Sequence, residues 1–224
     1  MKDYGVFDIL GPIMIGPSSS HTAGAARLGK VARTIAGGEI KSVVCLLHGS
    51  FAKTYKGHGT DRALVAGLLG MEPSDTRLRD ALQIAEDRNI NVQFEGTDLG
   101  DVHPNTVKFL IDGKNGHCEV VGSSIGGGNI QISEVNGQSV NFTGAYPTLI
   151  ISHRDVPGVV SKVTALLYEM KINIAFMNVF RTQKGKNATM VFQCDNNIQD
   201  DLIYEIKNID AIENVVSINS IAEG

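Results

Sequence analysis

Cysteine is scarce in this chain and is scattered along it. The three cysteines, Cys45, Cys118 and Cys194, form no Cys-x-x-Cys pattern. An odd number of widely spaced cysteines argues against a disulfide framework. It also argues against a complete cysteine-ligated metal or iron–sulfur site within this single chain. We therefore expect the cysteines to pack in the core, where free cysteine is common, and we expect no metal site built by this chain alone.

Long apolar runs and an excess of basic residues are missing as well. No stretch approaches the roughly 20 apolar residues that span a bilayer, and the residues after Lys2 lack the apolar core of a signal peptide. The net charge is −4, without a basic cluster, which argues against nucleic-acid binding. These absences predict a cytoplasmic protein that binds neither nucleic acid nor membrane.

The length of 224 residues is enough for two domains with separate cores. A Thr-Gly-Ala-Tyr-Pro stretch interrupts the pattern, so we expect one domain at residues 1–143 and a second at 147–224. In the second domain, apolar patterns predict strands at 148–152, 172–181, 188–194 and 215–221 and helices at 159–170 and 200–207. This β-α-β-β-α-β order is ferredoxin-like. With a mixed first domain, the expected fold class is α/β (α+β).

The first domain is expected to begin with a helix whose apolar face is Leu28, Val31, Ala32 and Ile35. Its expected N-cap is Ser20 or Thr22, and its stop is Gly37-Gly38. Strands are expected at 40–47, 91–95, 107–111, 117–121, 130–135 and 138–142, with turns at 112–116 and Asn136-Gly137 and a glycine loop at 123–129. Two more helices are expected, one at about 62–69 capped by Thr60 or Asp61, and one after Ser74 or Asp75 with the inner face Leu78, Ala81, Leu82 and Ala85.

Residues 18–22 read Ser-Ser-Ser-His-Thr and precede the first helix. A helix N-terminus exposes free backbone N–H groups and the positive end of the helix dipole, which suits a carboxylate or a phosphate. The following residues are small, which predicts a close approach by another group; they are Ala23, Gly24, Ala25, Ala26 and Gly29. The alternative is a serine-rich cap on an ordinary helix.

Histidines occur in expected loops flanked by Gly, Ser or Pro; they are His21, His48, His58 and His103. Loops on a rigid scaffold commonly carry chemistry. His58 lies between two glycines, so its ring can meet a ligand without neighbouring bulk, and imidazole suits a general base near neutral pH. A single histidine of this kind is more often structural or solvated, but four in such loops favour a functional site. The spacings match no histidine-based zinc motif.

Two further loops offer contacts to a ligand. Gly126-Gly127-Gly128 could cradle a phosphate through its backbone, although the Walker lysine spacing is missing, and the alternative is a tightly bent connection. Asp155, Pro157 and Gly158 lie between a strand and a helix and offer polar and backbone contacts to a small amino acid. The alternative there is a loop with an N-cap.

Taken together, five motifs resemble the iron–sulfur-dependent L-serine dehydratases (L-serine deaminases). They are residues 16–22 (Gly-Pro-Ser-Ser-Ser-His-Thr), 48–50 (His-Gly-Ser), 57–61 (Gly-His-Gly-Thr-Asp), 103–106 (His-Pro-Asn-Thr) and 124–128 (Ser-Ile-Gly-Gly-Gly). The chain is similar to the beta subunit of the two-subunit form, in which the cluster cysteines lie on a separate alpha chain. Residues 147–221 resemble an ACT domain, a ferredoxin-like module that often binds amino acids.

The resemblance implies a carbon–nitrogen lyase that converts L-serine to pyruvate and ammonia. The α-proton and the β-hydroxyl leave, and the resulting aminoacrylate becomes an imine that hydrolyses. A [4Fe–4S] cluster, ligated by cysteines of the alpha subunit, is implied as the Lewis acid that acts on the hydroxyl. The implied partners are the alpha subunit and a small amino-acid substrate, with self-association through the ACT domains as a further contact.

The resemblance also assigns roles to residues of this chain. The catalytic candidates are His58, His21 and His103, with His58 as the base that removes the α-proton. The residues expected to hold the carboxylate and amine of the substrate are Ser18, Ser19, Ser20 and His21. Those expected to close the pocket are Thr60, His103, Asn105, Ser124, Gly126 and Gly127, with His48 as a further candidate for orienting it. The candidates for binding an effector in the ACT domain are Asp155, Pro157 and Gly158.

Two other functions fit parts of the sequence. A non-catalytic amino-acid sensor would bind its effector in the ACT domain and use residues 1–143 as scaffold. Such a sensor has no need for the histidine and serine motifs outside the ACT domain. A metal hydrolase would use His21, His58 and His103 as ligands, and the metal content of the isolated chain would distinguish it, because we expect none.

Overall fold

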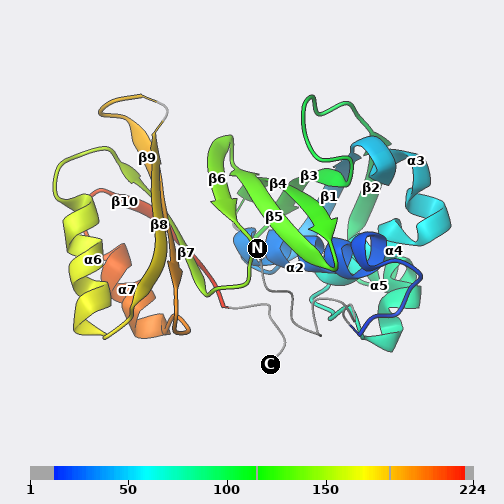
Figure 1. Ribbon diagram of the computed structural model, residues 1–224, viewed down its shortest axis with the longest axis horizontal. Coiled ribbons are helices and arrows are strands. Elements are labelled where there is room, and N and C mark those ends of the chain that lie inside the picture. The colour runs from blue at the N-terminus through cyan, green and yellow to red at the C-terminus, as the bar shows by residue number, and fades with distance from the viewer. Residues whose placement is uncertain (1–12, 115, 182, 220–224) are drawn as a thin grey trace, which may run out of the picture. The chain divides into compact units, whose positions relative to one another are not determined.

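The computed structural model describes residues 13–114, 116–181 and 183–219, which form two compact units divided between Asn136 and Gly137 (Figure 1). Each unit combines helices with a β-sheet, so the expected mixed α/β fold class is confirmed. In the described part of the chain, no helix is both long and apolar enough to cross a membrane. The domain boundary at 143–147 and the cytoplasmic location stay predictions.

The strands of the first sheet are β1 (Ile40–Leu47), β2 (Asn91–Gly96), β3 (Thr106–Gly113), β4 (Gly116–Gly126), β5 (Asn129–Val135) and β6 (Gln138–Phe142). Their order is β2-β1-β3-β4-β5-β6, with β1 parallel to β2 and antiparallel to β3. The expected strands are therefore found. Asn136 and Gly137 make the expected turn, with φ of 50° and 74°. The strand β4 continues to Gly126, so the expected glycine loop is shorter than predicted.

The helical segments of the first unit are η1 (Ser19–Gly24, a π-helical turn), α2 (Ala25–Ile35), α3 (Gly49–His58), α4 (Thr60–Leu68), η2 (Thr76–Asp80, a 3₁₀ turn) and α5 (Ala81–Asp87). Helix α2 packs on the sheet, with α4 beside it (Figure 1). The alternation of β1 explains this arrangement, because Val43, Cys45 and Leu47 are buried while Val44 and Leu46 between them are only half-buried.

Helices α2 and α4 cross at two glycines. A Cβ atom at Gly29 would lie 2.2 Å from the backbone oxygen of Leu64, and one at Gly67 would lie 2.0 Å from that of Ala26. Only a residue without a Cβ lets the two backbones approach this closely. The close approach expected from the small residues after Thr22 is confirmed, and the approaching group is helix α4.

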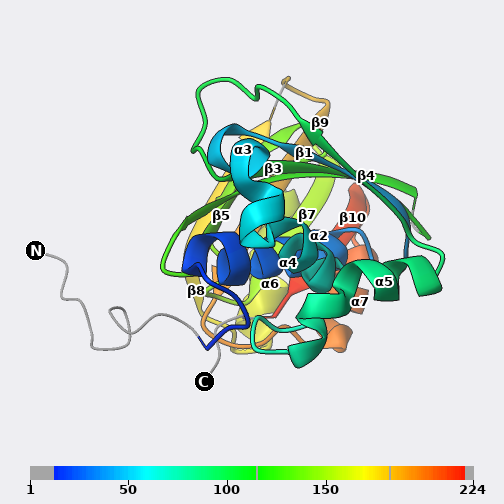
Figure 2. The same cartoon turned by 90° about the vertical axis from the view of Figure 1, so that its right-hand side faces the viewer.

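Three expectations about the helices of the first unit are wrong. Helix α3 was expected as a loop, yet it occupies the space between β1 and α4 (Figure 2). The first helical segment starts at Ser19, because the Ser18 hydroxyl accepts a hydrogen bond from the His21 backbone N–H at 3.3 Å and so caps it, in place of Ser20 or Thr22. Helix α4 follows Gly59, whose φ of 68° fits glycine, so neither Thr60 nor Asp61 is its N-cap.

The helix after Pro73 agrees better with the sequence. Asp75 caps the 3₁₀ turn η2, because its carboxylate accepts a hydrogen bond from the backbone N–H of Arg77 at 2.9 Å. Leu78, Ala81 and Ala85 are buried as expected. Leu82 was expected on the same inner face but is 36% exposed, because the short helix α5 turns only Ala81 and Ala85 inward.

Beyond β6, the second unit has the expected ferredoxin-like order. Its elements are β7 (Thr148–Arg154), α6 (Val159–Glu169), β8 (Ile174–Arg181), β9 (Asn187–Cys194), α7 (Asp200–Lys207) and β10 (Ile212–Ile218). The antiparallel sheet has the order β10-β7-β9-β8, and both helices cover one of its faces (Figure 1). Leu149, Val163, Leu167, Phe192 and Leu202 are fully buried in the core between helices and sheet.

Candidate active site

Two of the expected catalytic histidines are in direct contact. The rings of His21 and His58 meet edge to face, with centroids 4.8 Å apart and planes at 83°. His21 lies in η1 and is only 8% exposed, whereas His58 is the last residue of α3 and is exposed. Both were predicted in loops from the sequence, but both lie in helical segments. The backbone that carries each ring is therefore held by helical hydrogen bonds.

His21 is held by hydroxyl groups on both sides of its ring. Its Nε2 lies 3.1 Å from the Thr54 hydroxyl oxygen and 3.4 Å from that of Ser50, and its Nδ1 lies 3.4 Å from that of Ser18. Thr54 donates its own hydroxyl proton to the Ser50 carbonyl at 2.8 Å, so its oxygen accepts from His21. We therefore assign the ring proton to Nε2, which leaves Nδ1 to accept from Ser18.

The hydrogen bonds of His21 determine its tautomer, and its burial determines its charge. Desolvation, and then the nearby charge of His58, lower the pKa of His21 from its ordinary value. The imidazole of His21 is therefore neutral at pH 7. Phe51 packs edge-on against the same ring, with centroids 5.2 Å apart, and limits its rotation. These contacts make His21 a positioning group for His58.

The ring of His58 has open nitrogens. Within the described residues, neither ring nitrogen of His58 has a hydrogen-bond partner, and its ring contact is with His21. Gly57 and Gly59 flank it, and a Cβ atom at either glycine would meet nothing within 4 Å. Because His58 is exposed, a small molecule can reach its ring, as a general base requires.

A cavity of about 390 Å³ opens beside His58. The residues that line it are Ile15, Gly16, Pro17, Thr22, Lys56, Gly57, His58, Gly59, Arg62, Leu78 and Arg79. Such a volume holds a small amino acid with room to spare. Its lining joins the segment before η1, the junction of α3 and α4, and the 3₁₀ turn η2.

Of the groups around His21 and the cavity, Ser18 was predicted from the sequence, whereas the hydroxyl of Thr54, the contact of Ser50 with His21 and the cations of the cavity were not. Ser50, Thr54 and His58 are spaced four residues apart, so they share one face of α3. That spacing was a usable signal, but it has meaning only once α3 is known to be a helix. Lys56, Arg62 and Arg79 gave no signal, because isolated charges in a sequence are most often solvated.

His48 and His103 are placed differently from the His21–His58 pair, and neither lines the cavity. The Nδ1 of His48 accepts a hydrogen bond from the backbone N–H of Leu99 at 3.1 Å and lies 3.6 Å from the Asp98 carboxylate. The Nδ1 of His103 accepts from the backbone N–H of Asn105 at 3.1 Å, and its side chain is exposed. In this arrangement both imidazoles stabilise loops.

The loops that carry these two histidines nevertheless lie against the site. The carbonyl of Pro104 accepts hydrogen bonds from the backbone N–H groups of Ser50 at 2.8 Å and Phe51 at 3.4 Å. The backbone N–H of Ser124 donates to the carbonyl of Asn105 at 3.0 Å. The His-Pro-Asn-Thr segment is thus fixed between the start of α3, which contacts His21, and the strand that carries Ser124.

Three buried hydroxyl groups near these loops lack partners. Within the described residues, the side-chain oxygens of Thr22, Thr60 and Ser124 are buried without a hydrogen-bond partner. A Cβ atom at Gly24 would lie 2.0 Å from the Ser124 hydroxyl, so η1 and β4 are in close contact there. Each unsatisfied buried hydroxyl costs on the order of 1–3 kcal/mol, which a bound ligand or water would recover.

The remaining predicted residues are the serines of η1 and the glycines after β4. Ser19 and Ser20 are half-buried in η1. The glycine turn after Gly126 is fixed to helix α2, because Arg27 donates a hydrogen bond to the Gly128 carbonyl at 2.9 Å. Gly126 ends strand β4 with a φ of 107°, and Gly127 and Gly128, with φ of 61° and 82°, make the turn itself, which favours the bent-connection alternative over a phosphate cradle.

The residues of this chain do not fit a metal or cysteine-ligated cluster. In the part of the chain that the structure describes, no group of three His, Cys, Asp or Glu side chains could hold a metal ion. Cys45, Cys118 and Cys194 are all buried, as expected. Burial strongly raises the pKa of the Cys45 thiol and raises those of Cys118 and Cys194 to about 11, so all three stay protonated near neutral pH.

In the second unit, the expected effector loop is occupied by internal contacts. The Asp155 carboxylate accepts hydrogen bonds from the backbone N–H of Gly185 at 2.9 Å and from Arg181 at 3.2 Å. The hydrogen bond from Gly185 and the nearby Arg181 guanidinium lower the pKa of Asp155. Gly158 has a φ of 90° and precedes α6 as its N-cap, and Pro157 is exposed.

Comparison with known protein families gives two matches. The serine dehydratase beta chain family matches residues 5–135, and the ACT domain family matches residues 147–211. The chain is 44% identical to a "Probable L-serine dehydratase, beta chain" of Bacillus subtilis (strain 168), over 100% of both chains. It is 43% identical to an "L-serine dehydratase, beta chain" of Peptoniphilus asaccharolyticus, over 90% of this chain and 92% of that one. It is also 31% identical to a "D-3-phosphoglycerate dehydrogenase" of Methanocaldococcus jannaschii, over 87% of this chain and 37% of that protein.

Proposed function

The chain belongs to the serine dehydratase beta chain family, and from that premise we propose that it is the beta subunit of an L-serine dehydratase that converts L-serine to pyruvate and ammonia. The enzyme is a lyase, and the chain ends in an ACT domain. The observation that carries the proposal is the contact of His21 with His58, whose ring centroids are 4.8 Å apart, because His58 lines a cavity sized for an amino acid.

In this proposal His58 removes the α-proton of L-serine. His58 lines the cavity, and a positioned base of this kind contributes about 10²–10⁴-fold to the rate. His21 is neutral and fixed in one tautomer, so it orients the His58 ring without competing for the proton. After the β-hydroxyl has left, the aminoacrylate becomes an imine, and water hydrolyses it to pyruvate and ammonia.

The substrate-contacting residues of the proposal come from the turn η1, the start of α4, the end of β4 and the loop before β3. Ser19 and Ser20 are half-buried in the turn that carries His21, so their hydroxyls can bind the polar groups of serine. Thr60 and Ser124 each carry a buried hydroxyl without a partner among the described residues, and Asn105 is hydrogen-bonded to Ser124 through its backbone. The Nδ1 of His103 accepts a hydrogen bond within its own loop, so we assign His103 to closing the site and not to proton abstraction.

The rest of the site is proposed to come from the alpha subunit, which would ligate the [4Fe–4S] cluster with its own cysteines. The cysteines of this chain are buried and protonated and do not offer such ligands. We also propose that the enzyme is cytoplasmic and that the ACT domain binds an effector or associates with a second ACT domain. The alternative of a non-catalytic amino-acid sensor does not explain the open His58 ring outside the ACT domain.

The test is reconstitution of the two-chain enzyme. The chain is co-purified with its alpha subunit without oxygen, and pyruvate formation from L-serine is measured. The pair should be active, this chain alone should be inactive, and His58→Gln should lower turnover at least about 10²-fold. His117→Gln is the matched control, because His117 is an exposed histidine of β4 that pairs with Asp112 at 2.9 Å outside the site. Near-normal turnover by His58→Gln would exclude His58 as the base.

A further inference from the structure

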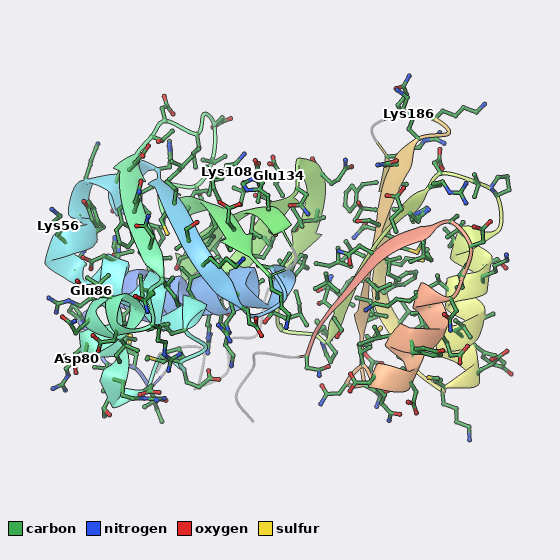
Figure 3. The ribbon with its side chains drawn as sticks, turned by 180° about the vertical axis from the view of Figure 1, so that it is seen from behind. Lys56, Asp80, Glu86, Lys108, Glu134 and Lys186 are labelled. Atoms are coloured by element: carbon green, nitrogen blue, oxygen red, sulfur yellow. The ribbon has the colours of Figure 1, made fainter. Side chains whose placement is uncertain are left out.

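The cavity beside His58 is lined by cations from three separate elements. Lys56 belongs to the last turn of α3 (Figure 3), Arg62 to the first turn of α4, and Arg79 to η2. Among the described residues, no aspartate or glutamate lines this cavity. A space of about 390 Å³ that brings three positive side chains together favours an anion.

The side chains of the two arginines of this cavity have no acidic partner among the described residues. Within the residues that the structure describes, the guanidinium groups of Arg62 and Arg79 make no ion pair or hydrogen bond, whereas neighbouring Arg77 pairs with Asp75 at 2.5 Å. The contact of the Lys56 ammonium is with the ring of Tyr55, at 5.7 Å from its centroid. The arginines that line the cavity are therefore free to bind a ligand, while the adjacent arginine outside it is occupied.

A neutral hydrogen-bond donor points to the same place. The Thr22 side chain lines the cavity, is only 1% exposed, and has a buried hydroxyl without a partner in the described part of the chain. Gly16 packs directly against this side chain, because a Cβ atom there would lie 2.3 Å from the Thr22 hydroxyl oxygen. Helix α4 also begins at this cavity, and the positive end of its dipole favours negative charge, part of which the Asp61 carboxylate supplies by accepting a hydrogen bond from the Arg62 backbone N–H at 2.8 Å.

We propose that Arg62 and Arg79 bind the carboxylate of the amino-acid substrate, with Lys56 adding charge and Thr22 a hydrogen bond. The inference rests on the proposed function, because it places the carboxylate beside the base that acts on the adjacent carbon. Arginine suits this task, since its planar guanidinium can donate two parallel hydrogen bonds to one carboxylate. The sequence pointed to the serines of η1 for this role, but the hydroxyls of serine carry no charge.

The same cations act on the reaction as well as on binding. When His58 takes the α-proton, the electron pair left on the α-carbon is shared with the carboxylate, whose negative charge grows. Fixed positive charges at that carboxylate stabilise the developing charge in the transition state. The arginines therefore contribute to kcat as well as to KM, and they make the site select substrates that keep a free carboxylate.

The test compares L-serine with L-serinamide in the reconstituted two-chain enzyme. The amide keeps the amine, the hydroxyl and the α-proton but carries no negative charge. Arg62→Met and Arg79→Met should each lower kcat/KM for L-serine by about 10–100-fold, as expected for loss of a charge-assisted hydrogen bond, and should leave that for L-serinamide nearly unchanged. Arg62→Lys should recover part of the loss, because it keeps the charge but not the planar fork.

A binding measurement complements turnover. L-glycerate, which has the carboxylate but no amine, should inhibit the wild-type enzyme competitively, and its inhibition constant should rise at least about 10-fold in either methionine variant. Arg88→Met is the matched control, because Arg88 is an exposed arginine at the end of α5 outside the cavity. An unchanged preference for L-serine over L-serinamide in both variants would overturn the carboxylate assignment. The proposed function would fail separately, by the wild-type pair making no pyruvate from L-serine.

Discussion

The hydroxyl oxygen of Thr54 lies 3.1 Å from Nε2 of His21 while its proton is donated to the Ser50 carbonyl at 2.8 Å. These two hydrogen bonds of Thr54 connect helix α3 to the turn η1 and determine which nitrogen of His21 carries the proton. Because His21 then contacts His58, the orientation of the proposed base depends on a threonine that does not line the cavity.

Thr54→Val should lower turnover about 10-fold, because the Nε2–H of His21 then keeps only the longer contact with the Ser50 hydroxyl at 3.4 Å, which allows the His21 ring to rotate and the His58 ring to move with it. It should also lower the free energy of unfolding by about 0.5–1.5 kcal/mol, the usual net contribution of one hydrogen bond. Both quantities are measurable by the pyruvate assay and by urea unfolding, and Thr54→Ser should restore both.

Thr34→Val is the control for this substitution. Thr34 also donates its hydroxyl proton to the carbonyl four residues earlier, that of Lys30 at 3.0 Å, but it has no histidine partner. It should leave turnover unchanged. Equal losses of turnover in the two valine variants would show that the helix, and not the contact with His21, explains the effect.

The lowered pKa of His21 predicts how stability responds to pH. The unfolded chain binds a proton at His21 more readily than the folded chain does, so the folded state loses stability as the pH falls below 6.5 towards the lowered value. Its contribution to stability is complete above that range. Urea unfolding between pH 8 and pH 5.5 should show a steeper loss for the wild type than for His21→Gln. Parallel curves would contradict the burial of a neutral imidazole.

Gly67→Ala should destabilise the first unit by about 1–3 kcal/mol, the usual cost of overpacking a core. The added Cβ would lie 2.0 Å from the backbone oxygen of Ala26, and that oxygen cannot move without moving α2. Gly57→Ala is the control, because it adds the same methyl group to a helix where nothing lies within 4 Å. It should leave stability unchanged or raise it by about 0.5–1 kcal/mol in urea unfolding.

Asp155→Ala should loosen the turn between β8 and β9. Its carboxylate accepts hydrogen bonds from Gly185 and Arg181, and its lowered pKa means that this support is present above the ordinary carboxyl pKa and is lost as the pH falls through the lowered one. Hydrogen exchange at the Gly185 amide should be faster in the variant, while that of core strand β9 should not change. If the exchange rate at the Gly185 amide were unchanged, Asp155 would not be needed for the turn, and the predicted contact of Asp155 with an effector would be favoured.

The strands were predictable because their residues signal them locally. Ile40–Leu47 is rich in β-branched and apolar residues, and the Asn136-Gly137 turn needs positive φ at both positions. Helix α3 gave no such signal. Phe51 is its buried residue, and two of its positions are glycine, so it forms through contacts with η1, α4 and the loop at Pro104 and not through its own apolar face.

The site was predictable only in part, for a related reason. Unusual motifs identified His21 and His58, which the fold brings into contact. Their supporting groups are ordinary residues whose roles depend on distant partners. The hydroxyl of Thr54 matters because η1 places His21 against it, and Arg79 matters because η2 carries it to the cavity that also contains Arg62.

The crossing of α2 and α4 at Gly29 and Gly67 has a consequence for the distance between the two imidazoles. The segment that carries His21 runs directly into α2, and Gly59 alone separates His58 from α4. The interaxial spacing of these helices therefore sets the separation of the rings. One methyl group added at either glycine would move the helices apart and change the distance between the two rings. The rate of proton abstraction would then fall, although no reacting group had been altered.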